Sequence, residues 1–328
     1  MAALNRPRVY VTQPIAASAL DRLRKIAEVE VFPDSGRIIP KDQLIAALPK
    51  HDILFSRLHD KVDRDVIAAN PKLVAITSMS ITPDNTDVAE ATRRKVPVTV
   101  VPPIVAEATA DIHFGLMLAV ARRMIEGDRM VRAGQFPGSQ SNYLAGVAVY
   151  GKTIGLVGAG RIGQATARRA KGFGMRVLYW APRRKLEAER EIGIEYVPLD
   201  KLLAEADFVS VHAAMNAETR HLINATAIAK MKPTAFIINT ARGPIIDEAA
   251  MVTALVEGRI AGAGLDVFEH EPNVDPDLLK LPNVVLAPHL GSAVVEVREV
   301  MANIVVDNIA ALVDGRVPPN CINPEVLK

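Results

Sequence analysis

The chain has 328 residues, of which 49% are hydrophobic and 23% charged, and its net charge is +2. This composition is typical of a soluble globular protein, and the length predicts two domains because one core rarely grows so large. The near-neutral charge excludes bulk electrostatic affinity for nucleic acid or membranes, and each long apolar stretch meets charges before it reaches a membrane-spanning length.

The first residues lack the apolar core of a signal peptide, and a strand-like segment at Val9–Val11 follows almost at once. The single cysteine, Cys321, excludes an intrachain disulfide and fits a reducing compartment. We therefore expect a cytoplasmic protein in which Cys321 is an inert thiol.

Strand-like and helix-like segments alternate from the start of the chain. Such alternation predicts parallel strands joined by crossover helices, which form a doubly wound sheet. The strand-like segments of this first run are Arg8–Val11, Val29–Val31, Ile53–Phe55 and Leu73–Ile76. The helix-like segments are Ala16–Ile26, Lys41–Leu48 and Arg64–Ala69.

A second run of the same kind begins near Val98–Val101, and it predicts a second doubly wound parallel sheet. Its helical stretches include Leu199–Glu205 and Glu248–Glu257, the latter closed by Gly258 at a C′ position. The further strand-like segments are Lys152–Val157, Met175–Trp180, Phe208–Val211, Ala235–Asn239, Gly262–Asp266 and Val284–Leu286.

Two helical stretches mark the crossings between the runs. After Pro102–Pro103, one long helix is expected over Glu107–Gly134, and its apolar faces fit either a subunit contact or burial in its own chain. A last amphipathic helix, about Val294–Val313, precedes no further strand, so we expect the chain to return there to its first domain. The predicted domains are 1–101 with 290–328, and 102–289 inserted between them.

A glycine-rich turn follows the strand-like segment that ends at Val157. Gly158, Gly160 and Gly163 form a G-x-G-x-x-G pattern that opens a helix, which is the context this pattern needs. The first glycine permits a tight turn, the second lets the backbone approach a pyrophosphate, and the third lets helix and strand pack closely. The N–H groups of Arg161 and Ile162 would face the phosphates, so the pattern predicts a Rossmann-type dinucleotide-binding domain.

The end of the next strand predicts which dinucleotide binds. An acidic residue that would hold a ribose 2′-OH is missing after Trp180, and the chain instead reads Ala181, Pro182, Arg183, Arg184. A guanidinium attracts a 2′-phosphate that a carboxylate would repel, although a solvated basic loop is the ordinary alternative. We expect a preference for NADP(H), with NAD(H) possible.

Three downstream blocks read Ile238–Pro244, Gly264–Pro272 and Ala287–Ser292. Together with the glycine pattern, these blocks resemble the D-isomer-specific 2-hydroxyacid dehydrogenase family, from about Asp52 to Asn320. Within that family the chain is most similar to the glyoxylate/hydroxypyruvate reductases, partly through Thr77–Ser80.

The resemblance implies catalytic roles for Arg242, Glu271 and His289. A guanidinium can grip the carboxylate and ketone of a 2-oxo acid and stabilise the alkoxide character that develops as hydride arrives. An imidazolium then supplies the proton, and a neighbouring carboxylate orients it. Arg242 follows an apolar strand, at the edge where open α/β sheets bind ligands.

The resemblance also implies cofactor contacts for Asp266, Thr240 and Thr219. Taken singly, Arg242 could be a surface arginine and His289 an ordinary histidine at a strand end. Glu269–Glu271 superficially resembles a metal cluster, but adjacent residues of an extended segment point to opposite sides, so no metal site is expected.

The substrate loop departs from the family pattern. The resemblance implies substrate contacts for Ser80, Ile81, Thr82, Arg242 and Ser292. The family usually has a glycine where this chain has Thr82, so Thr82 and Pro83 reshape or narrow the site.

Some relatives cover the substrate with a tryptophan from a neighbouring subunit. The only tryptophan here, Trp180, lies on the cofactor side, so Phe136 or Tyr143 would have to substitute for it. The resemblance implies a homodimer built around the cofactor domain.

The sequence therefore predicts an NADPH-dependent reductase that converts a small 2-oxo acid, glyoxylate or hydroxypyruvate, to the D-2-hydroxy acid. Two alternatives remain: reduction of a larger sugar acid such as 2-ketogluconate, and a dinucleotide-sensing interaction protein like the corepressors that resemble this family. Formate dehydrogenation is disfavoured because it handles no alcohol proton, whereas this chain retains a Glu–His pair.

Overall fold

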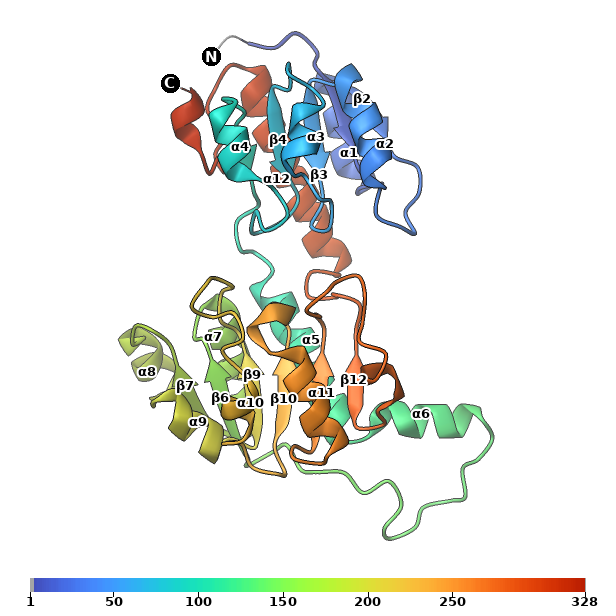
Figure 1. Cartoon of the computed structure of the whole chain (residues 1–328), viewed down its shortest axis with the longest axis vertical. Helices are drawn as coiled ribbons and strands as arrows, with labels where there is room; N and C mark the ends of the chain where they lie inside the picture. Colours follow the sequence, from blue (N-terminus) through green and yellow to red (C-terminus); the bar gives the residue numbers. More distant parts are fainter. Residues whose placement is uncertain (1–2, 328) are drawn as a thin grey trace. The chain divides into compact units, whose positions relative to one another are not determined.

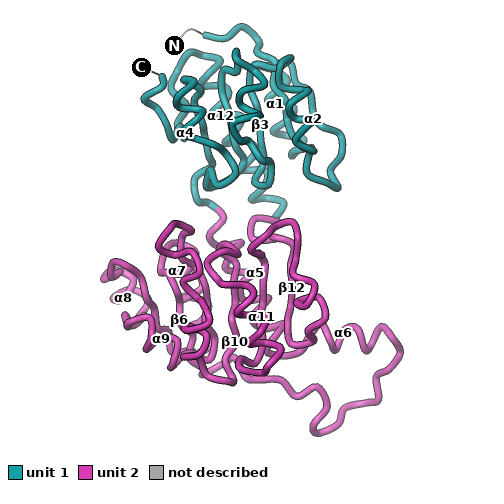
Figure 2. Tube along the Cα trace, viewed as in Figure 1, with its two compact units in different colours: residues 1–104, 294–328 teal, residues 105–293 magenta. Residues whose placement is uncertain are grey.

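A computed structural model describes residues 3–327 (Figure 1). The chain divides into two compact units, residues 1–104 with 294–328 (unit 1) and residues 105–293 (unit 2), as Figure 2 shows. The chain thus leaves unit 1 after Ile104 and returns to it at Val294. The predicted domain boundaries lie a few residues earlier, at 101/102 and 289/290.

Unit 1 contains a five-stranded parallel sheet in the order β2-β1-β3-β4-β5. Its strands are β1 (Arg8–Val11), β2 (Glu28–Val31), β3 (Ile53–Ser56), β4 (Ala75–Ser78) and β5 (Val98–Thr99). Its helices are α1 (Ala17–Ile26), α2 (Lys41–Ala47), α3 (Arg64–Ala68), α4 (Val88–Arg93) and α12 (Val295–Val313), with short 3₁₀ turns at Leu48–Lys50 and Pro324–Leu327.

Strand β4 begins two residues later than the sequence pattern predicted. The N–H of Leu73 donates to Asn70 O at 3.1 Å, which closes a turn at the end of the preceding helix. Pairing with β3 starts only at Ala75, opposite Ile53. A local turn bond therefore removes the first two residues of an apolar run from the sheet.

Unit 2 contains a seven-stranded parallel sheet in the order β12-β11-β10-β9-β6-β7-β8. Its strands are β6 (Thr153–Val157), β7 (Arg176–Trp180), β8 (Glu195–Tyr196), β9 (Phe208–Val211), β10 (Phe236–Asn239), β11 (Gly262–Leu265) and β12 (Val284–Leu286). Its helices are α5 (Ala106–Ala121), α6 (Met124–Arg132), α7 (Arg161–Gly172), α8 (Leu186–Ile192), α9 (Leu199–Glu205), α10 (Ala225–Ile228) and α11 (Glu248–Val256), with 3₁₀ turns at Gly243–Ile245 and Leu278–Lys280.

Helices cover both faces of this sheet because successive strand residues point to opposite sides. Val157 and Leu178 belong to a core cluster with side chains of α9, α10 and α11. Leu156 and Val177 belong to a second cluster with side chains of α5 and α7. The predicted fold class, two doubly wound parallel α/β domains, is confirmed.

The prediction of a single long helix over Glu107–Gly134 was wrong. This segment is divided into α5 and α6 at Arg123, whose φ of 52° lies in the left-handed region. The carbonyl oxygen of Ala121 accepts a hydrogen bond from Val147 N at 2.8 Å, so this acceptor serves a returning segment of the chain. A segment distant in sequence therefore ends α5.

Short elements with little periodicity, among them β8, α4, α8 and α10, went unpredicted. The C′ position proposed for Gly258 is confirmed by its φ of 67° directly after the end of α11. Within residues 3–327, no helix combines the length and the apolar content that crossing a bilayer requires.

Candidate active site

The carboxyl ends of the strands of unit 2 form the edge where open α/β sheets bind ligands. The strand order places the segments after β11, β10, β9, β6 and β7 side by side along this edge. The order of the sheet reverses between β9 and β6, which marks the switch point at which a crevice opens. The residues expected in the site follow these strands.

Two glycines of the G-x-G-x-x-G pattern lie against backbone, Gly158 in the turn after β6 and Gly163 in α7. A Cβ on Gly158, which has φ of 103°, would lie 2.6 Å from Ala213 N. A Cβ on Gly163 would lie 2.5 Å from Gly158 O. Backbone atoms cannot move aside as a flexible side chain can, so both positions require glycine.

Gly160 faces open space instead. A Cβ there would meet no protein atom within 4 Å, and Gly160 is the N-cap of α7 without a side-chain capping bond. The N–H groups of Arg161 and Ile162 lie in the first turn of α7, where helix geometry leaves them without intrahelical acceptors. The open cradle and the helix N-terminus fit the pyrophosphate of a dinucleotide.

The two arginines after β7 differ in their contacts. The guanidinium of Arg184 donates to Glu189 on α8, with Nε 3.0 Å from Oε1, and lies over the ring of Tyr196 at 5.5 Å. The hydrogen bond from Arg184 lowers the pKa of Glu189, which keeps this carboxylate ionised. Arg183 is exposed. Arg184 is therefore already paired with Glu189, so Arg183 is the more available of the two for a 2′-phosphate.

The two threonines expected in the cofactor groove are both buried. The hydroxyl of Thr219 donates to Ala214 O at 2.7 Å and accepts from Asn216 N at 2.8 Å, so it closes the turn that follows β9. Thr240 directly follows β10, and its Oγ1 lies 2.9 Å from Nδ1 of His113 on α5.

The segment that carries Arg242 lies against the segment that carries Glu271. Asn239 Nδ2 donates to Arg242 O at 3.1 Å, which holds the turn after β10. A Cβ on Gly243 would lie only 1.9 Å from Phe268 O. The absence of a side chain at Gly243 therefore allows the two segments to approach each other.

Glu271 and His289 form a pair. Glu271 Oε1 accepts from Phe268 N at 3.0 Å, and its Oε2 lies 3.0 Å from Nδ1 of His289. A carboxylate bound to one ring nitrogen fixes the orientation of the imidazole ring. The structure thus brings together two of the side chains expected in catalysis.

Asp266 holds the turn on which His289 lies. Its carboxylate accepts from Leu290 N at 2.6 Å and Gly291 N at 2.8 Å, and its carbonyl accepts from His289 N at 2.9 Å. Burial raises the pKa of Asp266, against the effects of these donors and of nearby His289. His289 has φ of 57°, a conformation that costs on the order of 1–3 kcal/mol for a non-glycine residue and persists only where its surroundings hold it.

The neighbouring carboxylate Glu269 has different partners. It accepts from His221 Nε2 at 2.7 Å and from Arg220 Nη2 at 3.1 Å, and its own N–H donates to Glu248 Oε2 at 3.0 Å. Burial acts to raise the pKa of Glu269, but the hydrogen bond from His221 contributes to a net lowering. The sequence did not predict these contacts of Glu269, because its partners His221, Arg220 and Glu248 share no recognisable spacing with it.

The expected substrate loop follows β4 in unit 1. Ser80 Oγ donates to Thr82 O at 2.7 Å, and Thr82 Oγ1 donates to Asp84 at 2.8 Å, so the loop is folded on itself. Ser292 lies in unit 2, in a turn that Ala293 N closes onto Leu290 O at 2.7 Å. Substrate contacts at Ser80, Ile81, Thr82 and Ser292 stay predictions.

Residues 114–291 match the family described as D-isomer specific 2-hydroxyacid dehydrogenase, NAD binding domain. The chain belongs to this family. The resemblance found in the sequence is thereby confirmed, and unit 2 contains the family's NAD-binding domain. Membership makes the protein an oxidoreductase.

Relatives in this dehydrogenase family extend over nearly the whole chain. A glyoxylate reductase of Thermococcus litoralis is 45% identical over 326 residues, with 98% of each chain covered. One from Korarchaeum cryptofilum is 47% identical over 326 residues, again with 98% of each covered.

The fold is shared with solved structures. An NADPH-dependent glyoxylate/hydroxypyruvate reductase of Sinorhizobium meliloti, in complex with NADP and malonate, has a TM-score of 0.84 and 33% identity, with 97% of each chain covered. A Thermus thermophilus protein has a TM-score of 0.89 and 41% identity, with 96% of this chain and 99% of that chain covered.

Proposed function

We propose that the protein reduces glyoxylate or hydroxypyruvate with NADPH, giving the D-2-hydroxy acid where the product is chiral. The observation that carries this proposal is the Glu271–His289 pair, with 3.0 Å between Oε2 and Nδ1. Glu271 follows β11, the neighbour of the strand β10 that Arg242 follows, and His289 follows β12, one strand further along. Relatives named glyoxylate reductase, 45% and 47% identical, support the choice of substrate.

Each of the three side chains has a distinct task in this reaction. A dinucleotide bound at the carboxyl edge of unit 2 would supply the hydride that the carbonyl carbon of the 2-oxo acid accepts. Arg242 grips the substrate carboxylate and ketone oxygen and stabilises the negative charge that develops on that oxygen. His289 transfers a proton from Nε2 to the same oxygen, so the carbonyl becomes a hydroxyl. Glu271 holds Nδ1 and thereby aims the ring.

The dinucleotide contacts follow from the carboxyl edge of unit 2. The N–H groups of Arg161 and Ile162 would hold the pyrophosphate beside Gly160. Arg183 would pair with the 2′-phosphate of NADPH, and Arg184 would contribute less because Glu189 competes for its guanidinium. The NADP-bound relative from Sinorhizobium meliloti supports this preference.

We also propose that Thr82, where the family usually has a glycine, and Pro83 make the loop that follows β4 bulkier, which favours small 2-oxo acids over sugar acids.

We further propose that the protein is a homodimer. Helix α6 has no buried residue, its Val131 is 61% exposed, and Phe136 beyond its end is 63% exposed. Figure 2 shows α6 and the segment after it extending away from the body of unit 2. A second copy of this chain would cover these apolar side chains.

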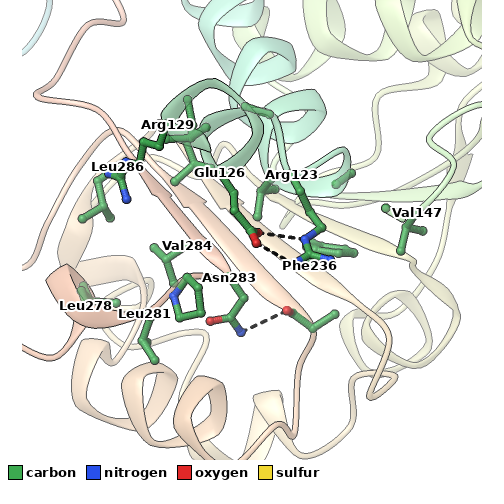
Figure 3. A pocket seen from close by; sticks show the side chains of 18 of the residues that line it. Arg123, Glu126, Arg129, Val147, Phe236, Leu278, Leu281, Asn283, Val284 and Leu286 are labelled. Carbon is green, nitrogen blue, oxygen red and sulfur yellow. Dashed lines mark hydrogen bonds and ion pairs between the residues drawn. The ribbon is translucent and has the colours of Figure 1, made fainter. Parts of the chain in front are cut away.

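A cavity of about 530 Å³ beside α6 supports the proposal that a second copy binds here (Figure 3). It is lined by α6 and by the starts of β10 and β12, at Phe236 and Val284. The cavity therefore lies at the amino end of the strands, opposite the catalytic edge. Such a place suits a subunit contact better than a substrate site.

The test is an assay of the purified protein with a panel of 2-oxo acids, each with NADPH and NADH in parallel. We expect the highest kcat/KM for glyoxylate or hydroxypyruvate with NADPH. Faster reduction of 2-ketogluconate would contradict the substrate choice, and absence of turnover with every acid would favour an interaction protein instead.

A further inference from the structure

Four side chains of unit 2 form a hydrogen-bonded chain directly behind the carboxyl edge of the sheet. Thr240 Oγ1 lies 2.9 Å from Nδ1 of His113, and the Nε2 of His113 lies 2.7 Å from Ser210 Oγ. Ser210 Oγ also lies 2.8 Å from Nε2 of His212. The four residues come from α5, β9 and the segments that follow β9 and β10.

Both histidines of this chain are uncharged. His113 and Ser210 are each 0% exposed, and burial lowers the pKa of His113 well below its ordinary value. Burial also lowers the pKa of His212 to about 3. The two rings lie 4.5 Å apart between centroids, so a charge on either ring would also oppose a charge on the other. Each ring therefore carries a single N–H.

The proton of Ser210 decides which nitrogens carry these N–H groups. If Ser210 donated to His212 Nε2, the His212 proton would be on Nδ1, which is buried and has no hydrogen-bond partner among the described residues. A buried N–H donor without an acceptor is rare and unfavourable. If Ser210 instead donates to His113 Nε2, only a lone pair of His212 is unsatisfied.

The favoured arrangement therefore runs in one direction. His212 Nε2–H donates to Ser210, Ser210 donates to His113 Nε2, and His113 Nδ1–H donates to Thr240. Thr240 is thus an acceptor inside the protein, and its own O–H is available to an acceptor outside this chain of bonds. Thr240 lies where the edge of the sheet is expected to bind the dinucleotide.

The position along the edge indicates which half of the dinucleotide is met. The strand order runs from β11, which Asp266 follows, through β10 and β9 to β6 and then β7, which precedes Arg183. Thr240 follows β10, on the side of Asp266 and His289. Arg183, expected at the adenosine 2′-phosphate, lies on the opposite side of the glycine turn.

We propose that His113, Ser210 and His212 are positioning residues that hold the Thr240 hydroxyl as a hydrogen-bond donor to an oxygen of the bound nicotinamide nucleoside. This inference rests on the proposed function, since it requires that the protein bind a dinucleotide. In this proposal His113, Ser210 and His212 act through Thr240, to which His113 is hydrogen-bonded.

The first experiment reads the proton positions directly in the full-length protein. The ring nitrogens of ¹⁵N-histidine-labelled protein are observed by NMR, and His113 is assigned by comparison with His113→Asn. We expect His113 to be neutral with its proton on Nδ1 between about pH 6 and 8. A proton on Nε2, or a charged ring, would overturn the proposal.

The second experiment is a double-mutant cycle on NADPH affinity, read by fluorescence. Thr240→Val and His113→Leu should each weaken NADPH binding about three- to tenfold, and the double variant should be no weaker than Thr240→Val alone. His113→Asn is the matched control, because its amide N–H replaces Nδ1–H and should restore most of the affinity. Binding of 2′,5′-ADP, which lacks the nicotinamide half, should change little in any variant.

The outcomes separate the two proposals. Additive losses in the cycle, or equal losses for NADPH and 2′,5′-ADP, would show a merely structural role for His113 and overturn the inference. If His113→Leu does not fold, Thr240→Val with both ligands and the NMR experiment still decide it. A wild-type protein that binds neither NADPH nor NADH would refute the proposed function, and this inference with it.

Discussion

Replacement of Gly243 by alanine tests the contact that joins the Arg242 and Glu271 segments. The added Cβ would lie 1.9 Å from Phe268 O, 2.0 Å from Phe268 C and 2.4 Å from Glu269 N. Since Cβ atoms essentially never approach closer than 3.0 Å, the Phe268 oxygen would have to move by about 1 Å. All three atoms belong to the backbone, so no side-chain rotation relieves the clash.

The magnitude follows from what holds that backbone. The N–H of Glu269 is bound to Glu248 at 3.0 Å, and that of Phe268 to Glu271 at 3.0 Å, so a shift is passed to the Glu271–His289 pair. Overpacking costs about 1–3 kcal/mol, which lowers Tm by roughly 2–12 °C for a unit of this size. A displacement of about 1 Å at a catalytic group lowers kcat on the order of 10²-fold.

The assay combines steady-state kinetics, NADPH affinity and thermal unfolding. Gly243→Ala should lose kcat and Tm and retain most of its NADPH affinity, because the glycine turn follows β6, two strands away from β10 in the sheet. The matched control is Gly172→Ala at the end of α7, where a Cβ meets nothing within 4 Å, and it should be neutral or slightly stabilising. A Gly243→Ala enzyme with wild-type kcat and Tm would refute the reasoning.

Three further predictions follow from the site and the surface. His289→Ala should lower kcat on the order of 10²–10⁴-fold with NADPH affinity unchanged, and unchanged turnover would mean that another group supplies the proton. Arg183→Ala should lower kcat/KM for NADPH at least about tenfold, or about 1.4 kcal/mol, and leave the kinetics with NADH unchanged. Arg184→Ala should have a smaller effect. Equal losses with NADPH and NADH would show that neither arginine contacts the 2′-phosphate. Sedimentation at micromolar concentration should give a dimer mass for the wild type and a monomer mass for Val131→Glu in α6, and a monomeric wild type would contradict the proposed interface.

The structure distinguishes between neighbouring residues that the sequence alone treats alike as candidate site residues. Arg183 and Arg184 are equivalent in the sequence, but Glu189 on α8 pairs with only one of them. Among the acidic residues Glu269 and Glu271, only the second reaches His289. Such choices depend on which segments meet in space, and no spacing along the chain encodes them.

The alternation of apolar strands with amphipathic helices determined the fold class, because strand and helix periodicities are local properties of the chain. The same alternation placed Gly158 and Arg242 directly after apolar strands, and parallel strands end at one edge of a sheet. The catalytic roles of Arg242, Glu271 and His289 came from the resemblance of their sequence blocks to the family. These assignments need no knowledge of long-range contacts.

Tertiary contacts decided the rest. Val147 ends α5 by binding the carbonyl of Ala121, and Asp266 holds His289 in a left-handed backbone conformation. The chain of bonds from His212 to Thr240 joins residues up to 127 positions apart, His113 and Thr240 being the most distant pair in contact. The packing of α5 on the sheet decides which of these polar side chains meet. Because that packing depends on contacts between distant parts of the chain, only the folded molecule shows the result.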